Sequence, residues 1–453
     1  MLPGAPVTDS DLMACRRQMF LDFCALLDRE SIAYVILSGY QSYPDRIESD
    51  VDFMVSAVDF ARLPGTLGRP GSIPGAQLLQ RLQHEATACY YVFAKQVGER
   101  LAYLHPDAAS DYRRRGRLWL SSDSVLASRR LTPAGFWVPA AAVEFEYYLV
   151  KRIDKLSLGA AHVARLAALM WEDEPGCLAA ASRLLRPDHV HGLQDALQSS
   201  DVAWFAEHGA ALRRDLAAAM PRESFVDRMT SRLADARRVL QRLRQPTGFV
   251  IAVLGPDGSG KTTVIEHLER ELAPAFRQVR RFHLRPHFGK ALGRGVIVRE
   301  PHSQAPRSAL ASLLKTMLFV VDYWWGWLRI IWPARVRSTL VIFDRYYHDM
   351  LVDPRRYRLP PHYGFYRSMA TSVPRPDLWI VLTASPDVLI ARKGEITRAS
   401  AAELVQAYRM LAHQYGSGSF ETDVPLAQTL AGVVAATTEP LQTRTSARIG
   451  TIG

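Results

Sequence analysis

The feature that most constrains the fold is a glycine-rich loop that follows an apolar run near the middle of the chain. Residues 249–254 are all apolar and lead directly into Gly255-Pro-Asp-Gly-Ser-Gly-Lys-Thr-Thr263. A helical pattern follows, with its apolar positions at Val264, Ile265, Leu268 and Leu272. A strand, such a loop and a helix in this order place backbone N–H groups and the positive end of a helix dipole around a phosphate. We therefore expect a phosphate-binding loop here, called the P-loop below.

The residue types in the P-loop indicate which part of a nucleotide each of them would hold. Lys261 has the position that reaches the β- and γ-phosphates, and Thr262 has the position that ligates Mg²⁺. The sequence therefore predicts ATP and Mg²⁺ as cofactors. The residues expected to contact the nucleotide are Gly255, Asp257, Gly258, Ser259, Gly260, Lys261, Thr262 and Thr263.

Two later apolar runs predict the fold around the P-loop. Residues 339–343 and 378–382 are continuous apolar stretches, typical of strands that are buried on both faces of a parallel sheet. Helical patterns separate them, so we expect a doubly wound α/β unit. Gln245-Pro-Thr-Gly248 interrupts the preceding helical pattern and marks where this unit begins.

A carboxylate follows the second apolar run. Ligands bind at the carboxyl ends of parallel strands, so Asp344 is expected to face the P-loop. There it would hold Mg²⁺ through water or accept a proton from an attacking hydroxyl, while Arg345 would clamp an anionic acceptor. The alternative for Asp344 is a strand-end residue that caps a turn.

Basic residues after the other strands complete the predicted site. Arg392 and Lys393 follow the third apolar run, where a lid would close over ATP and add positive charge to the transferring phosphoryl group. The alternative is a solvated basic helix face. His283 and Arg285 follow another expected strand and would contact the acceptor, unless they form only a surface basic cluster.

Together these residues resemble the thymidylate kinase-like branch of P-loop kinases over residues 249–434. The resemblance rests on the P-loop, Asp344-Arg345-Tyr346, Pro376-Asp377-Leu378 and Arg392-Lys393. It implies a kinase fold, catalytic roles for Lys261, Asp344, Arg345 and Arg392, and acceptor contacts from Arg345 and Tyr346. Residues 347–358 depart from authentic thymidylate kinases, which continue with a Ser and an Ala-Tyr-Gln element, and the P-loop carries Asp257 where a basic residue would assist catalysis.

Within this family, the chain is more similar to the thymidylate kinase-like proteins that are associated with the synthesis of bacterial surface polysaccharides. That resemblance rests on Gly-Pro-Asp-Gly-Ser-Gly-Lys in the P-loop and on Pro301-His-Ser before a long aromatic helix. It implies that the acceptor is a sugar hydroxyl of a polysaccharide or glycolipid precursor. Two alternatives stay open, a nucleoside monophosphate kinase and a regulatory module that binds ATP without turning it over.

The N-terminal part carries a second group of carboxylates. Residues 32–37 and 51–55 are short β-branched runs. Asp50 and Asp52 alternate with apolar residues, so both lie on one strand face, where they could bind divalent metal. With Asp107 this resembles a nucleotidyltransferase core, and the resemblance implies that Asp107 is a third metal ligand. The chain has Gly39-Tyr40 where that family has a small residue after the glycine, and a Tyr there could block a triphosphate. A degenerate or acceptor-binding domain is the alternative to a second, nucleotidyltransferase activity, which stays an open question.

These patterns predict an α/β protein of several domains. We expect a small nucleotidyltransferase-like α/β domain over residues 1–135, a helical middle domain over 136–245 and a P-loop kinase domain over 246–436. Residues 437–453 are expected to form a flexible tail. A chain of 453 residues is long enough for two or three such domains.

Charge and cysteine content indicate the setting. The net charge of +11 favours anionic partners, which we expect to be a nucleotide and an anionic or carbohydrate acceptor and not nucleic acid. The 4 cysteines lack metal-ligand spacing and the N-terminus lacks a secretion signal, so we expect a cytoplasmic protein. The oligomeric state is left open.

One apolar stretch raises the question of a membrane. Residues 309–332 are rich in Leu, Val, Ile and Trp, but Lys315, Asp322 and Arg329 interrupt them, which disfavours a spanning helix. We expect a helix packed against the protein. The alternative is peripheral contact with the inner membrane face or a glycolipid through Trp324, Trp325, Trp327 and Trp332.

Overall fold

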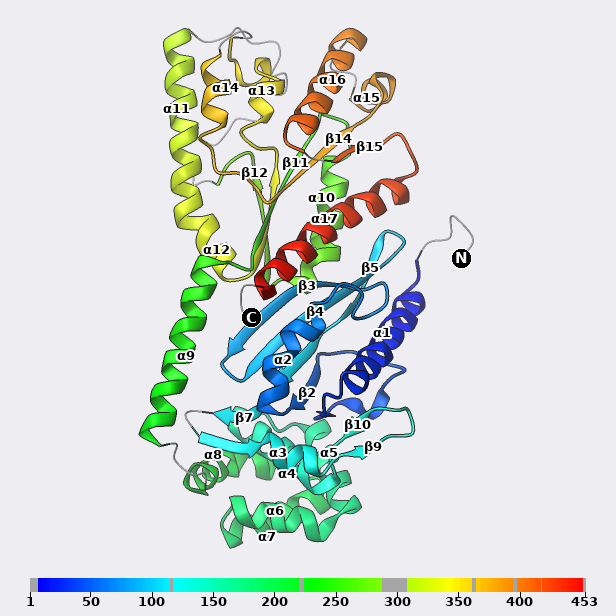
Figure 1. Ribbon diagram of the computed structural model, residues 1–453, viewed down its shortest axis with the longest axis vertical. Coiled ribbons are helices and arrows are strands. Elements are labelled where there is room, and N and C mark those ends of the chain that lie inside the picture. Colours follow the sequence, from blue (N-terminus) through cyan, green and yellow to red (C-terminus); the bar gives the residue numbers. More distant parts are fainter. Residues whose placement is uncertain are drawn as a thin grey trace. The chain divides into compact units, whose positions relative to one another are not determined.

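The computed structural model describes residues 7–114, 117–219, 224–286, 308–360, 364–393, 397–416 and 418–450 (Figure 1). The chain forms two compact units. The C-terminal unit consists mainly of Leu240–Arg444, and the N-terminal unit mainly of Thr8–Lys95 and Ala102–Val239. The Pro301-His-Ser segment lies outside the described residues.

A five-stranded sheet forms the centre of the C-terminal unit. Its strands have the order β12-β13-β11-β14-β15, and every neighbouring pair is parallel. The strands are β11 (Phe249–Leu254), β12 (Gln278–His283), β13 (Thr339–Asp344), β14 (Leu378–Thr383) and β15 (Gly418–Glu421). The prediction of a parallel sheet built on the apolar runs is therefore confirmed.

Helices cover both faces of this sheet. They are α10 (Lys261–Leu272), α11 (Ala309–Gly326), α12 (Trp332–Val336), α13 (Asp349–Val352), α14 (Phe365–Ala370), α15 (Pro386–Lys393), α16 (Arg398–Gln414) and α17 (Leu426–Gly450), with a π-helical turn at Trp327–Ile331. Val250, Ala252 and Leu254 share one core with Phe319 of α11 and Tyr408 of α16. All of β11 is buried and α10 packs against β11 and β13, as expected for a doubly wound unit.

The last helix corrects one prediction. Residues 437–453 were expected to be a flexible tail, but α17 continues as far as Gly450. Its buried side chains Leu430, Val433, Val434 and Leu441 recur at helical spacing, and the Thr437 hydroxyl donates to the Val433 carbonyl at 2.8 Å. The expectation is therefore wrong for residues 437–450.

The N-terminal unit contains a sheet of six strands. Its order is β1-β2-β6-β4-β3, with β5 paired to β4, and β2 and β6 are parallel. The strands are β1 (Tyr34–Ile36), β2 (Val51–Val55), β3 (Gln77–Glu85), β4 (Ala88–Val97), β5 (Arg100–Leu104) and β6 (Pro106–Ala109). The accompanying elements are α1 (Asp9–Arg29), α2 (Ala57–Leu67), α3 (Ser122–Ala127), and the pairs β7 (Asp111–Arg114) with β8 (Arg117–Ser121) and β9 (Arg130–Leu131) with β10 (Trp137–Val138).

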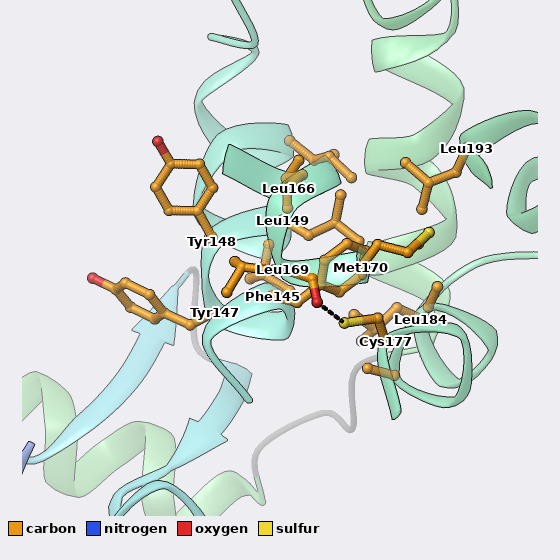
Figure 2. Close-up of a cluster of buried hydrophobic side chains, with 14 of the residues drawn as sticks. Phe145, Tyr147, Tyr148, Leu149, Leu166, Leu169, Met170, Cys177, Leu184 and Leu193 are labelled. Atoms are coloured by element: carbon orange, nitrogen blue, oxygen red, sulfur yellow. Dashed lines mark hydrogen bonds between the residues drawn. The ribbon is translucent and has the colours of Figure 1, made fainter. Parts of the chain in front are cut away.

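The predicted helical middle region is present but is not a separate unit. It comprises α4 (Ala141–Lys155), α5 (Ala160–Glu172), α6 (Glu174–Leu184), α7 (Pro187–Gln198), α8 (Val202–Ala219) and α9 (Phe225–Arg244). Figure 2 shows its core, in which the Cys177 thiol lies 3.5 Å from the Leu169 carbonyl oxygen. The same hydrophobic cluster includes Val35 of β1 and Met54 of β2, which explains why the sheet and most of these helices form one unit.

Candidate functional site

The P-loop connects β11 to α10 as the sequence predicts. Gly258 and Gly260 have left-handed backbone conformations, with φ of 84° and 80°, which glycine adopts without strain. A Cβ atom at Gly255 would lie 2.4 Å from the Leu382 carbonyl oxygen, so the loop needs a glycine there as well. The Ser259 hydroxyl is buried and has no hydrogen-bond partner within the described part of the chain. These features fit a backbone cradle for phosphate.

Lys261 is turned into the P-loop. Its Nζ atom donates to the carbonyl oxygens of Gly255 at 2.9 Å and Pro256 at 2.7 Å, and lies 3.8 Å from Asp257 Oδ1. Burial, assisted by the nearby charge of Arg345, lowers the pKa of Lys261 to about 7. Thr262 and Thr263 follow on the exposed side of α10.

Three basic side chains lie around the Asp257 carboxylate at the P-loop. Arg345 Nη2 donates to its Oδ1 atom, Arg356 Nη1 donates to its Oδ2 atom at 2.6 Å, and Lys261 lies beside it. Burial on its own would raise the pKa of Asp257, but Arg345 and Arg356 hold it well below its usual range. Sequence reasoning included Asp257 and Arg345 but missed Arg356.

Asp344 lies at the carboxyl end of β13, next to β11, as predicted. In the parallel register it stands opposite Val253 of β11 and His283 of β12. Arg281 Nη2 donates to Asp344 Oδ2 at 3.0 Å, and His283 Nδ1 lies 3.8 Å from the same oxygen. Burial opposes ionisation, but His283 and Arg281 lower the pKa of Asp344 to about 2, so the carboxylate is charged.

Arg345 is held from its other side by a fully buried carboxylate. Its Nη1 atom donates to Asp349 Oδ2 at 2.6 Å, and the backbone φ of Arg345 is 71°, an unusual value for a side chain of this size. Tyr357 at 2.7 Å and Tyr408 at 2.5 Å donate their hydroxyls to Asp349 as well. Sequence reasoning missed Asp349, because Arg345 precedes α13 and has a non-helical backbone, so no helical spacing indicates the pair.

Arg392 contacts the P-loop from α15. Its Nη1 atom donates to the Gly258 carbonyl at 3.1 Å and to Thr422 Oγ1 at 3.2 Å. The structure therefore places this basic residue beside the expected phosphate position. Lys393 ends α15, and its side chain lies outside the described residues.

Two predicted acceptor residues have other partners in the structure. Arg285 Nη1 donates to Asp322 of α11 at 2.7 Å, and its guanidinium stacks 4.6 Å from the centre of the Phe319 ring. Tyr346 is fully buried, and its hydroxyl donates to the Pro374 carbonyl at 2.5 Å. Neither side chain is presented to an acceptor in this arrangement, whereas His283 is largely exposed beside Asp344.

The N-terminal carboxylates lie close together but have protein partners. Asp52 accepts from Lys151 Nζ at 2.7 Å, and Asp50 accepts from the Tyr90 hydroxyl at 2.9 Å. Burial and the charges of Asp52 and Asp50 raise the pKa of Asp107 to about 7. Within the described ranges, no group of three or more His, Cys, Asp or Glu side chains is arranged to hold a metal ion. The structure thus lends no support to the metal site predicted at Asp50, Asp52 and Asp107.

Tyr40, the residue after Gly39, is almost fully buried. Its hydroxyl donates to Glu144 of α4, and Glu144 is also bound by Arg165 Nη2 at 2.7 Å. These contacts fix the Tyr40 ring inside the N-terminal unit. The ring therefore packs between the sheet and the helices as a structural element.

The apolar stretch before β13 forms a helix with one buried and one exposed face. Phe319 and Tyr323 are buried, while Trp324 and Trp325 are exposed. Trp327 and Trp332 are half-buried. In the part of the chain covered by the structure, no helix combines the length and apolar character that crossing a membrane requires.

The fold and the loop define a P-loop nucleotide-binding domain on a parallel α/β sheet. Residues 253–411 match the family model "Thymidylate kinase", so the C-terminal unit contains a thymidylate kinase-like domain, although the match leaves most of the chain outside it. A search of curated proteins found no relative.

Two solved thymidylate kinases are similar to part of the chain. The enzyme from Ehrlichia chaffeensis is 17% identical, with a TM-score of 0.30, over 42% of this chain and 99% of its own. The enzyme from Candida albicans is 17% identical, with a TM-score of 0.33, over 43% of this chain and 92% of its own.

Proposed function

We propose that the C-terminal unit is an ATP- and Mg²⁺-dependent kinase that phosphorylates a sugar hydroxyl of a polysaccharide or glycolipid precursor. One observation carries the kinase proposal. Lys261 is held in the P-loop by two carbonyl oxygens, while Asp344 ends β13, the strand next to β11, at the same edge of the sheet. This edge is where nucleotides bind in open parallel sheets.

The residues present fit a nucleotide and its metal ion. The N–H groups of the P-loop and the buried Ser259 hydroxyl would hold phosphate oxygens, and Lys261 would bind the β- and γ-phosphates. Thr262 and Asp344 supply oxygen atoms of the type that Mg²⁺ prefers. When bound, Mg²⁺ neutralises charge on the transferring phosphoryl group, and Arg392 adds a cation beside the loop.

The ionised state of the Asp344 carboxylate is compatible with a hydroxyl acceptor. Phosphoryl transfer passes through a loose transition state in which positioning and electrostatics contribute more than covalent chemistry. A carboxylate whose pKa is lowered to about 2 stays ionised and can accept a hydrogen bond from the attacking hydroxyl. Asp344 would therefore hold the hydroxyl oxygen toward the phosphoryl group through this hydrogen bond. A carboxylate of such low pKa is a weak base, so it would take the proton only as the new bond is completed.

A nucleoside monophosphate is the second candidate acceptor, and one observation favours it. Arg345 and Arg356 both donate to Asp257, so two guanidinium groups lie side by side at the P-loop. Guanidinium groups bind phosphate in a bidentate manner, as an acceptor phosphate requires. The match to thymidylate kinases is compatible with either acceptor.

The exposed face of α11 supports contact with a lipid surface that carries the acceptor. Trp favours the boundary between lipid and water, and the Arg329 guanidinium stacks 4.3 Å from the Trp325 ring centre. Exposed apolar side chains follow this face and the turn after it, at Leu310, Leu314, Met317, Leu318, Val321, Trp324, Trp325 and Leu328. The net charge of +11, which belongs to the whole chain, favours an anionic over a neutral membrane surface.

Sedimentation with vesicles tests this contact. We expect the protein to bind vesicles of mixed neutral and anionic phospholipid more than neutral vesicles, and the change of Trp324 and Trp325 to Ser to reduce binding. Trp171 is also highly exposed but lies in the N-terminal unit, so Trp171→Ser is the matched control. Equal recovery of the wild type and the double variant would contradict the proposal.

Transfer of label from γ-labelled ATP tests the kinase and its acceptor together. The acceptors are nucleoside monophosphates, free sugars and lipid-linked oligosaccharides, and we expect label on a sugar hydroxyl. Lys261→Ala and Asp344→Ala should reduce transfer by at least about 100-fold. Lys155→Ala, on the exposed end of α4, is the control and should leave transfer unchanged.

The other outcomes of this assay decide between the candidates. Label on nucleoside monophosphates alone would establish the second acceptor and overturn the first. ATP binding without turnover on any acceptor would favour a regulatory nucleotide-binding module.

A further inference from the structure

A row of polar side chains crosses three neighbouring strands of the N-terminal sheet. In the register of the sheet, Asp52 of β2 stands opposite Asp107 of β6, and Asp107 stands opposite Tyr90 of β4. Residues opposite one another on adjacent strands project from the same face of a sheet. Asp50, two residues before Asp52, belongs to this face as well. We call Asp50, Asp52 and Asp107 the carboxylate row.

A lysine from the helical region reaches the centre of this row. Lys151 of α4 donates from Nζ to Asp52 Oδ2 at 2.7 Å and to the Tyr147 hydroxyl oxygen at 2.9 Å. The Lys151 side chain is 13% exposed, and that of Asp52 is 31% exposed. Figure 2 shows Tyr147 pointing away from the leucine cluster, which leaves its hydroxyl available to Lys151. The ammonium group thus has two fixed partners in a mostly buried position.

The other two carboxylates of the row also face donors from the protein. Asp50 accepts from Tyr90 and lies 3.8 Å from His105 Nδ1. Asp107 Oδ1 lies 3.5 Å from His84 Nε2. The rings of Tyr90 and Tyr103 stack against His105, at 5.6 and 5.5 Å between ring centres, and hold it in place. Each of the three carboxylates therefore lies close to a donor side chain of the N-terminal unit.

This arrangement does not fit the metal-binding use of such carboxylates. A divalent cation binds carboxylate oxygens at roughly 2.0–2.6 Å, so a cation on Asp52 would lie close to the Lys151 ammonium, which already contacts Asp52 Oδ2. Two positive charges on one carboxylate repel each other in a partly buried site. Without a metal ion, the excess of carboxylate over ammonium in the row would repel a triphosphate.

We infer that Lys151 takes the place of a divalent cation in the carboxylate row, so that the N-terminal unit carries a site of nucleotidyltransferase-like layout that excludes metal. The inference does not depend on the kinase proposed for the C-terminal unit. It assigns Lys151 the role of a built-in cation that neutralises Asp52 and fixes α4 against β2. It also implies that this row does not bind a nucleoside triphosphate.

Titration with Mn²⁺, followed by electron paramagnetic resonance of the free ion, tests the inference on the full chain without nucleotide. We expect the wild type and Asp52→Asn to bind Mn²⁺ equally, because Asp52 is not a ligand. Lys151→Met should gain about one Mn²⁺ per chain, bound at least about 10-fold more tightly than in the wild type, since removing the ammonium leaves Asp52 and Asp107, a pair of carboxylates opposite one another in the sheet, free to share the ion. The double variant of Lys151→Met with Asp52→Asn should lose that site.

Controls make each outcome decisive. Lys155→Met removes a lysine from the exposed end of the same helix and should gain no Mn²⁺ site. A wild-type Mn²⁺ site that Asp52→Asn abolishes would overturn the inference, and this comparison needs no Lys151 variant. A folded Lys151→Met protein, verified by circular dichroism, that gains no site would overturn it too.

Discussion

Arg345 and Asp349 form a hydrogen-bonded ion pair in the interior of the C-terminal unit. Arg345 Nη1 lies 2.6 Å from Asp349 Oδ2, and the Asp349 side chain has no exposed surface. Through its other nitrogen Arg345 binds Asp257 of the P-loop. The pair therefore ties the segment after β13 to the loop that would bind nucleotide.

Asp349→Asn should destabilise the C-terminal unit strongly. The change leaves the Arg345 charge buried without its carboxylate, and breaking such a pair costs about 3–5 kcal/mol of unfolding free energy. Urea denaturation measures the loss. The control is Asp387→Asn, which removes the exposed partner of Arg398 and should cost less than about 1 kcal/mol. Equal effects of the two changes would show that the buried pair adds no stability.

Nucleotide binding should be coupled to protonation of Lys261. Burial lowers the pKa of this lysine to about 7, so it is mostly neutral near pH 8, and phosphate beside it stabilises the charged form and raises the pKa. Calorimetry of ATP binding near pH 8, in buffers of different ionisation enthalpy, should show uptake of close to one proton. Uptake should shrink near pH 6, where Lys261 is already charged. Heats independent of the buffer near pH 8 would contradict the expectation.

His348 should make the C-terminal unit sensitive to acid. Its ring is buried against Trp379 and Tyr415, and burial lowers its pKa from 6.5 to about 3. The unfolded chain binds the proton first, so stability is full above pH 6.5 and falls as pH drops from 6.5 toward 3, by up to about 1.4 kcal/mol per pH unit.

Replacement of this ring tests the acid sensitivity. Urea denaturation between pH 7 and pH 4 should give a smaller loss of stability for His348→Phe than for the wild type. His413→Phe changes an exposed ring at the end of α16 and is the control. The same pH dependence in His348→Phe and the wild type would rule out His348 as the cause.

Arg392→Ala should reduce phosphoryl transfer without unfolding the protein. Arg392 joins the Gly258 carbonyl of the P-loop to Thr422, and a cation placed near the transferring group contributes about 100- to 1,000-fold to the rate. We expect kcat to fall more than the affinity for ATP. Arg398→Ala, which removes only an exposed ion pair with Asp387, should leave both unchanged. Loss of ATP affinity alone would show that Arg392 serves only in binding.

Local patterns predicted the parts of the structure whose determinants are contiguous. The P-loop and the strands beside it follow from apolar runs and glycines within short windows, and Asp344 was placed correctly because a residue after a parallel strand must lie at the sheet edge. The extent of α17 was missed, because Ala, Thr and Gly obscure its apolar stripe.

Such local patterns could not predict contacts between residues that are far apart in the sequence. Arg356 reaches Asp257 across 99 residues of sequence, and Lys151 reaches Asp52 across the same separation. Tyr346 follows Asp344-Arg345 in a familiar motif, yet its ring packs against Tyr323 and Trp379 in the core. Periodicity reveals which face of an element is buried, but it does not reveal which side chain of another element arrives there.

The bonds from Lys261 to the Gly255 and Pro256 carbonyls have a consequence for the choice of donor. To bind Lys261, the phosphate oxygens of an incoming nucleotide must replace these two carbonyl oxygens as hydrogen-bond acceptors. The heat of binding then includes the difference between the new hydrogen bonds and the old ones. If Lys261 contacts the β- and γ-phosphates as proposed, a nucleotide that ends at the α-phosphate does not reach the lysine and does not replace the carbonyls. The P-loop would thus bind nucleoside triphosphates in preference to monophosphates, and it would do so before an acceptor binds.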